Sequence, residues 1–150
     1  MTFKAKRHAT AKATGVITVM MLSAGFVFGG VGAANAMGPM VEAMDQDVSG
    51  GVVTASKIMA GENGWLVVHR TDNNMKPGPV VGYAPLKKGE NIDVTAILQE
   101  PVKSGEMLML MVHSEAGGMK TGVFEYTLGA KEDGPIKPDG KLVMKVVSAQ

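Results

Sequence analysis

From residue 52 to the C-terminus, apolar residues come in short runs that are separated by turn-forming residues. The separators are pairs and triplets such as Asn63-Gly64 and Asp133-Gly134-Pro135. Glycine tolerates a positive φ and proline fixes φ, so these residues specify turns. The apolar residues show no helical period. The pattern predicts an all-β fold, an antiparallel β-sandwich or barrel of about seven strands, at residues 52–59, 65–71, 80–84, 92–98, 107–114, 123–128 and 142–147.

Two of the predicted strands are apolar on both faces. Residues 65–69 read Trp-Leu-Val-Val-His, and residues 109–113 read Met-Leu-Met-Val-His. The strand at residues 92–98 differs, because its first half alternates apolar with polar residues, as a strand with one wet face does. Strands that are apolar on both faces are typical of central strands covered on both sides, or of strands at an interface.

The first 36 residues have the pattern of a secretory signal peptide. Four basic residues and no acidic one accompany an apolar stretch, and the segment closes with Ala34-Asn35-Ala36, the small-x-small pattern that signal peptidase needs. The alternative is a retained membrane anchor, since about 20 apolar residues span a bilayer; the many glycines favour cleavage. We expect a signal peptide at residues 1–36, a flexible lead-in at 37–50 and a single β-sandwich domain at 51–150. The mature protein is then exported to the periplasm, the cell surface or the exterior.

Cleavage changes the charge of the protein. The whole chain has 15 basic and 14 acidic residues, and the leader contains four of the basic ones. The remaining chain has 11 basic against 14 acidic residues, a net charge of −3. Such a chain lacks the basic surface that binds phosphate backbones, so we expect no nucleic-acid partner. Cysteine is absent, which excludes thiol catalysis, thiolate metal sites and blue-copper chemistry.

A series of motifs carries a resemblance to a known family. The motifs are GWLVVH at residues 64–69, PGPVVGYAPL at 77–86, LMLMVH at 108–113, GVFEY at 122–126 and DGP at 133–135. In this order they resemble a domain of unknown function found in exported and cell-surface proteins, best represented in haloarchaea and also found in bacteria. The resemblance covers residues 52–147 and implies an immunoglobulin-like or cupredoxin-like β-sandwich. It implies no activity, and this chain departs from the haloarchaeal members by being less acidic and rich in methionine.

Methionine and histidine supply the candidate chemistry. A period of two places Met107, Met109, Met111 and His113 on one face of their strand. His69 ends the other strand that is apolar on both faces. If the two strands are neighbours in matching register, the two histidines approach each other near one end of the sandwich. Thioethers and imidazoles without cysteine are a plausible ligand set for Cu(I). We therefore name His69, His113, Met109 and Met111 as candidate copper ligands.

Each of these features also has a simpler interpretation. Methionine packs irregular cores, so the methionine face is either core or metal site. A strand-end histidine often forms a hydrogen bond at the rim of a sheet. Residues 37–40, Met-Gly-Pro-Met, are either a second soft-metal site or an ordinary mobile terminus. Residues 72–74, Asp-Asn-Asn, together with Glu115 would offer oxygen ligands to calcium, or they form a turn.

Signatures of common enzyme classes are missing from the sequence. It contains no nucleophile elbow, zinc-protease helix motif, phosphate-binding loop or dinucleotide fingerprint. Ser114 follows His113, but adjacent strand residues point to opposite faces and do not form a nucleophile–base pair. We therefore predict a non-catalytic exported module for binding or structural interaction, with a protein partner or self-association. The alternative is a copper-binding protein.

Overall fold

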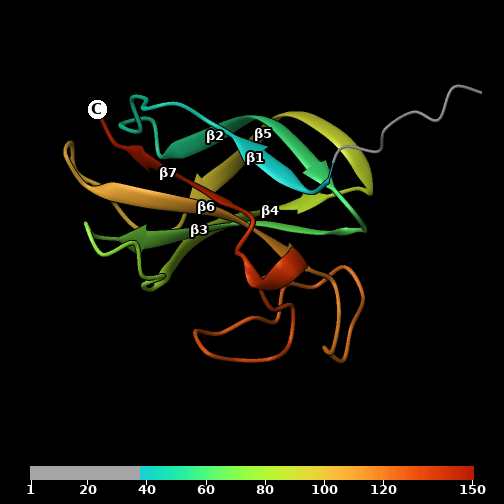
Figure 1. The fold of residues 1–150 in the computed structure, drawn as a ribbon. Helices are drawn as coiled ribbons and strands as arrows, with labels where there is room; N and C mark the ends of the chain where they lie inside the picture. The colour runs from blue at the N-terminus through green and yellow to red at the C-terminus, as the bar shows by residue number, and fades with distance from the viewer. Residues whose placement is uncertain (1–37) are drawn as a thin grey trace, which may run out of the picture. The chain divides into compact units, whose positions relative to one another are not determined.

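The computed structural model describes residues 38–150, and the predicted signal peptide at residues 1–36 lies outside this range. Seven strands and one short 3-10 turn make up the regular structure, without an α-helix in the described part of the chain (Figure 1). No helix in residues 38–150 is long and apolar enough to cross a membrane. The elements are β1 (Met40–Glu42), β2 (Val52–Ala60), β3 (Gly64–Thr71), β4 (Val80–Leu86), β5 (Gly89–Leu98), β6 (Met107–Ser114), η1 (Pro138–Gly140) and β7 (Met144–Ser148).

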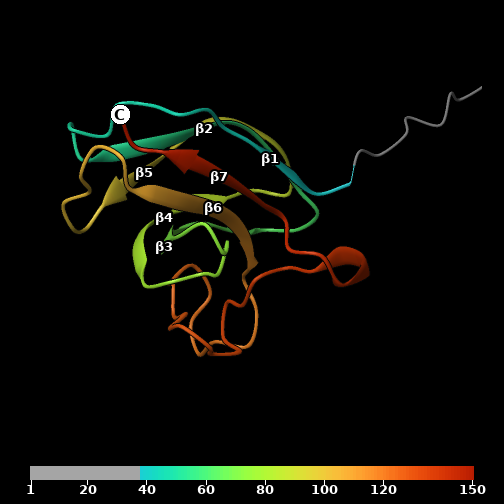
Figure 2. The same ribbon diagram turned by 60° about the vertical axis from the view of Figure 1, so that its left-hand side comes forward.

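All seven strands pair antiparallel in one sheet, in the order β1-β2-β5-β4-β3-β6-β7. The two ends of this sheet come back toward each other (Figures 1 and 2). Gln46, just after β1, forms a parallel bridge with Ala149, and its carbonyl accepts a hydrogen bond of 2.9 Å from the N–H of Gln150. The sheet therefore nearly closes into a barrel-like sandwich, and the all-β antiparallel prediction is confirmed.

The inside of this sandwich is the main hydrophobic core. Successive strand residues point to opposite faces, so one set of residues from each strand lines the interior. On β3 and β6 this set comprises Leu66, Val68, Leu108, Leu110 and Val112, all of them buried. The opposite set on the same two strands is buried as well, although it faces away from this core. Both strands are therefore covered on both faces, as their sequences indicate.

A glycine lets β3 and β6 pair to their ends. Gly64, the first residue of β3, lies opposite Ser114, the last residue of β6. A Cβ atom at Gly64 would collide with the backbone carbonyl of His113. Only glycine leaves room for this approach, because the obstruction is backbone and cannot rotate away. The close pairing holds His113 at a fixed place beside the start of β3.

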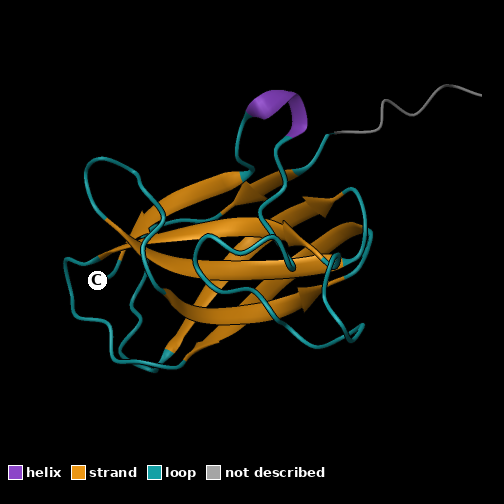
Figure 3. Cartoon of the chain, turned by 90° about the horizontal axis from the view of Figure 1, so that it is seen from below, coloured by secondary structure: helices purple, strands orange, loops and turns teal. Residues whose placement is uncertain are grey.

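The segment between β6 and β7 differs from the prediction. A strand is expected at residues 123–128, but residues 115–143, which we call the cap, contain only the short η1 turn and an isolated bridge. The cap lies against the outer face of β3 and β6, where Phe124 contacts Trp65 and Tyr126 contacts His69. Figure 3 shows loops that cross in front of the strands when the sheet is seen from below. The apolar residues of the expected strand therefore cover a sheet instead of joining one, because β7 already occupies the free edge of β6.

The segment before β2 also differs from the prediction. Residues 37–50 are expected to be a flexible lead-in, but Met40–Glu42 pair with β2 as strand β1. Ala43 and Val48 are buried in the main core. Residues 40–48 therefore belong to the folded domain, because their few apolar side chains close one end of the sandwich, a long-range role that leaves no periodic pattern in so short a stretch. Met37 lies outside the described residues.

Candidate functional site

The candidate site lies on the outer faces of β3 and β6. These strands are neighbours, and their ladder places His69 opposite Met109 and Trp65 opposite His113. Directly opposed residues point to the same side of a sheet, so the histidines and methionines share one face. Met109, His69 and His113 are all at most 1% exposed. The predicted sharing of a face is confirmed.

The ladder does not place the two histidines opposite each other. Val67 and Met111 form the pair that lies between them. The two rings nevertheless meet, with their Nε2 atoms 3.4 Å apart and their centroids 5.4 Å apart. The structure therefore brings His69 and His113 together, although not through the matching register expected from the sequence.

The other nitrogen of each ring is bound to a backbone carbonyl. The Nδ1 atom of His69 lies 2.8 Å from the carbonyl oxygen of Gly78, and that of His113 lies 2.6 Å from the carbonyl oxygen of Asp133. A carbonyl oxygen only accepts hydrogen bonds, so each Nδ1 carries a proton and donates it. In a neutral imidazole the remaining nitrogen then holds a lone pair. The two Nε2 lone pairs consequently point toward the same small space.

Burial keeps both rings neutral at pH 7. Desolvation lowers the pKa of His69, with a smaller opposing effect from its hydrogen bond to Gly78. Desolvation also lowers the pKa of His113, to about 4; the hydrogen bond to Asp133 opposes this, and the neighbouring His69 adds to it. A proton on either Nε2 atom would create a buried cation, which burial disfavours. Both Nε2 atoms are therefore unprotonated, and their lone pairs face each other.

Aromatic side chains of the cap cover the histidine pair. The ring of Tyr126 stands edge-on to His113 at 4.6 Å and to His69 at 5.9 Å between centroids. Phe124 packs between Trp65 and Tyr83, at 5.5 Å and 4.3 Å. The outer face of β3 and β6 is thus covered by the chain itself. It is not the exposed apolar surface that self-association through these strands would need, and the expected partner stays a prediction.

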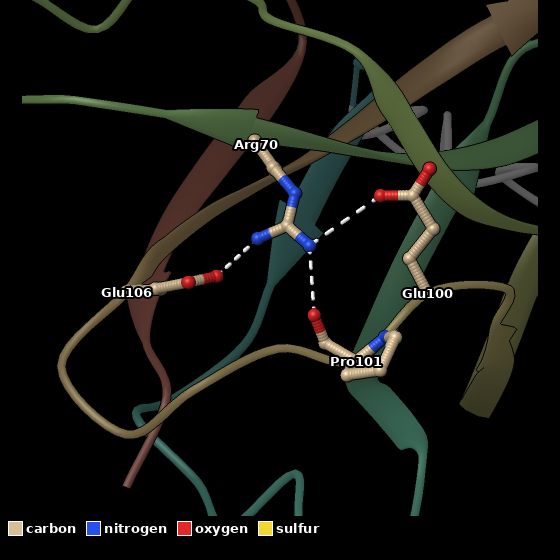
Figure 4. A network of polar contacts seen from close by, with 4 residues as sticks. All are labelled: Arg70, Glu100, Pro101 and Glu106. Carbon is tan, nitrogen blue, oxygen red and sulfur yellow. Dashed lines mark hydrogen bonds and ion pairs between the residues drawn. The ribbon is translucent and has the colours of Figure 1, made fainter.

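The carbonyl that binds His69 is held by a second cluster at the end of β3. The N–H of Gly78 donates to the carbonyl of Arg70, at 2.8 Å. The guanidinium of Arg70 pairs with Glu106 and donates to the carbonyl of Pro101 at 2.8 Å, with Glu100 at 3.5 Å (Figure 4). This network ties the end of β3 to the loop between β5 and β6. The backbone partner of His69 is therefore fixed independently of the cap.

The donor set suits a soft metal ion. Residues 38–150 contain no cluster of three or more His, Cys, Asp or Glu side chains that could hold a metal. A site here would combine the two imidazole nitrogens with thioether sulfur. Met111 lies on the same face, between the histidines along the ladder, and Met109 lies opposite His69. Donation of Nδ1–H to a backbone carbonyl is also the usual arrangement of a metal-binding histidine.

The other candidate clusters have structural explanations. Met40 belongs to strand β1, so it lies in the sheet and not in a mobile terminus. The carboxylate of Asp72 accepts hydrogen bonds from the N–H of Asn74 at 2.8 Å and from its side-chain amide at 3.1 Å. Residues 72–74 therefore form a side-chain-stabilised turn, which favours the turn over the calcium interpretation.

Three contributors to this site were not predicted from the sequence. They are the carbonyls of Gly78 and Asp133, which bind Nδ1, and the ring of Tyr126. Every residue has a carbonyl, so the first two leave no signal in the sequence. Phe124 and Tyr126 alternate in the predicted strand at residues 123–128, and this alternation was the one available sign that they point to the same side.

Comparison with known proteins identifies the domain but not an activity. A family model described as a domain of unknown function (DUF7282) matches residues 39–150. The match includes strand β1 and the whole cap. No curated protein and no solved structure matches the chain.

Proposed function

The chain belongs to the family of domains of unknown function DUF7282, and from its site we propose that it is an exported, non-catalytic module that binds Cu(I) between His69 and His113. The family assigns no activity, so the proposal depends on the geometry of the histidine pair. One observation carries it: two buried imidazoles, each fixed by a backbone carbonyl, direct their free Nε2 atoms at each other across 3.4 Å.

The separation of the two nitrogens suits a bent arrangement around one metal ion. Metal–imidazole bonds are about 2 Å long, so two of them in a straight line would separate the nitrogens by about 4 Å. A separation of 3.4 Å corresponds to an N–metal–N angle of roughly 115° at that bond length. Such an angle leaves room for a third ligand, and the thioethers of Met111 and Met109 lie on the same face.

The charge of the surroundings favours a monovalent ion. The proposed ligands are neutral, and burial of a divalent ion among neutral groups would leave two uncompensated charges in an apolar site. Thioether sulfur is a soft donor that selects Cu(I), and imidazole suits copper in general. Neutral rings at pH 7 need no deprotonation before binding, which follows from the lowered pKa values of both histidines.

The enclosure of the site favours binding over catalysis. Both histidines are at most 1% exposed, so a substrate has no open approach to the metal. A protein with such a site would store or carry copper, which agrees with the predicted export, because the leader expected at residues 1–36 directs the chain to the compartments where copper carriers work.

Competition for copper tests the proposal. The purified protein is titrated with Cu(I) against a chromophoric chelator of known affinity, beside the variant H69N/H113N. Asparagine keeps an N–H donor near the position of Nδ1, which preserves the bonds to the backbone carbonyls, but it removes Nε2. We expect one Cu(I) per wild-type chain and no binding beyond the chelator in the double variant.

The methionines are tested in the same titration. M111L keeps most of the side-chain volume but removes the sulfur, and M59L on β2 is the matched control. We expect M111L to weaken Cu(I) binding at least tenfold and M59L to leave it unchanged. Equal affinity in all three proteins would remove Met111 from the ligand set, and no binding by the wild-type protein would disprove the proposed function.

A further inference from the structure

We propose that Asp133 is the positioning residue of the histidine site, because it fixes the ring of His113 with its carbonyl and holds the cap over the pair with its carboxylate. This inference rests on the proposed function where it concerns metal affinity. Its first part, the control of the orientation of His113, concerns the protein without metal and is tested separately.

The side chain of Asp133 is buried within the cap and is only 1% exposed. Its Oδ1 accepts a hydrogen bond from the N–H of Ala116 at 3.1 Å, and its Oδ2 accepts one from the N–H of Glu125 at 2.8 Å. The N–H of Asp133 itself donates to the carbonyl of Ala116, at 2.8 Å. A buried carboxylate that accepts two backbone N–H bonds forms strong charge-assisted interactions. Asp133 therefore joins the first, middle and later parts of the cap.

The backbone around Asp133 lies against the end of β6. The Nδ1–H of His113 donates to the carbonyl of Asp133 at 2.6 Å, and the N–H of Ser114 donates to the carbonyl of Gly134 at 2.9 Å. Pro135 forms an isolated bridge with His113. Asp133 has a φ of 45°, a conformation in which aspartate, asparagine and glycine are the best tolerated residues. This turn aims the carbonyl of Asp133 at the ring of His113.

The same carboxylate also locates the aromatic cover of the site. Its Oδ2 holds the N–H of Glu125, and the next residue is Tyr126, whose ring stands edge-on to both imidazoles. Loss of the carboxylate would release the backbone of Glu125, the residue that precedes that tyrosine. The cover and the orientation of His113 therefore depend on one buried side chain.

The two histidines differ in this dependence. The partner of His69 is the carbonyl of Gly78, which is held by Arg70 at the end of β3 and not by the cap. A change at Asp133 should therefore disturb the Nδ1 hydrogen bond of His113 and leave the Nδ1 hydrogen bond of His69 in place. This asymmetry distinguishes a positioning role from a general loss of stability, which would affect both rings alike.

The test compares D133N with D139N. Asparagine tolerates the positive φ. Its NH₂ group would replace one of the two accepting oxygens and face a backbone N–H, so one of the two hydrogen bonds would be lost. Asp139 is an exposed acidic residue of the same cap with a φ of 52°, so D139N is the matched control. The proteins without metal are compared by ¹H–¹⁵N correlation spectra of the imidazole nitrogens, which report the protonated nitrogen of each ring, and then by Cu(I) competition.

We expect D133N to reduce the Nδ1–H form of His113 and to leave the Nδ1–H form of His69 unchanged. Cu(I) binding should weaken ten- to a hundredfold, which is the usual effect of losing the hydrogen-bond partner of a metal-binding histidine. D139N should match the wild type in both measurements. If D133N does not fold, D133G keeps the backbone conformation without the carboxylate and should give the same pattern.

Two results would overturn the inference. One is an unchanged His113 tautomer together with an unchanged Cu(I) affinity in D133N. The other is an equal disturbance of both histidines, which would reduce Asp133 to a general structural role. If the wild-type protein binds no copper while D133N still alters His113 alone, the proposed function fails and the control of His113 by Asp133 stands.

Discussion

At the scale of single residues, the histidine pair is the least ordinary feature of this domain. Two imidazoles that both donate through Nδ1 cannot hydrogen-bond to each other through Nε2 while they are neutral. Their contact at 3.4 Å is therefore stabilised by a bound cation, or it costs stability in the protein without metal. Buried polar groups without a partner typically cost about 1–3 kcal/mol each. A costly arrangement that is held in place by backbone carbonyls is typical of a binding site.

The low pKa of His113 makes the stability of the metal-free protein depend on pH. The pKa is about 4 in the folded protein and near 6.5 in the unfolded chain. Between these values the unfolded chain binds the proton more readily, so stability is complete above about pH 6.5 and falls as the pH drops toward 4. The lowered pKa of His69 acts in the same direction.

For His113 alone the expected loss is roughly 3 kcal/mol between these two pH values. Urea unfolding of the metal-free protein at several pH values between 7 and 4 measures it. The variant H113N should lose clearly less stability over this range. A wild-type protein and a variant with parallel pH profiles would contradict the burial of His113 as a neutral ring.

At the scale of elements, the cap behaves as a cover on a finished sheet. The main core lies on the other side of β3 and β6, and few residues of the cap contribute to it. The cap is held to the sheet by its aromatic residues, by Asp133 and by the backbone bonds of residues 134–136. Segments with few buried contacts open more easily than the core of a domain. We therefore expect the cap to open without unfolding of the strands.

Removal of Phe124 should loosen the cap selectively. The ring lies 4.3 Å from Tyr83 and 5.5 Å from Trp65, so F124A removes the aromatic contact of the cap with Trp65 and Tyr83 and leaves that of Tyr126 with the histidines. For this half-buried ring we expect a loss of about 2 kcal/mol, below the 3–5 kcal/mol typical of fully buried aromatic residues. Hydrogen exchange should accelerate in residues 115–143 and remain unchanged in β2 and β5.

The neighbouring V123A is the matched control, because Val123 is 47% exposed. It should leave the exchange of the cap unchanged. If F124A accelerates exchange throughout the sheet, the cap and the sheet unfold together and the cap is not a separate unit.

At the scale of the whole domain, the sandwich is closed by the segment that follows β1. The side chain of Gln46 binds both backbone groups of Thr54: its Oε1 accepts from the N–H at 2.8 Å, and its Nε2 donates to the carbonyl at 2.9 Å. Its own backbone bonds to Ser148 and Gln150 at the other end of the sheet. One residue therefore links β2 to the C-terminal end of the chain.

Truncation of Gln46 tests this closure. Q46A leaves the two half-buried backbone groups of Thr54 without their partners, and we expect a loss of about 2 kcal/mol. Urea unfolding measures it, with an unchanged dependence on denaturant if the domain remains one cooperative unit. Q99A, at an exposed glutamine after β5, should change stability by less than about 0.5 kcal/mol. Equal stability of Q46A and Q99A would show that Gln46 does not close the sandwich.

Local patterns in the sequence specify which segments form most of the strands and how their faces are distributed. Apolar runs and turn residues predict β2 to β6 to within a few residues, because strand formation depends on local alternation and on backbone restrictions at glycine and proline. The shared face of Met109, Met111 and His113 follows from the same period. The double coverage of β3 and β6 follows from the unbroken apolar runs at residues 65–68 and 107–112.

What covers that second face, and how the site is assembled, depends on long-range contacts in the folded domain. Residues 123–128 have the composition of a strand, but the pairing of β6 with β7 leaves them no partner, so they cover the sheet. The two histidines are 44 residues apart in the chain and meet although the ladder separates them. Their tautomers are set by two backbone carbonyls. A carbonyl is common to every residue, and only the path of the folded chain decides which one reaches an imidazole.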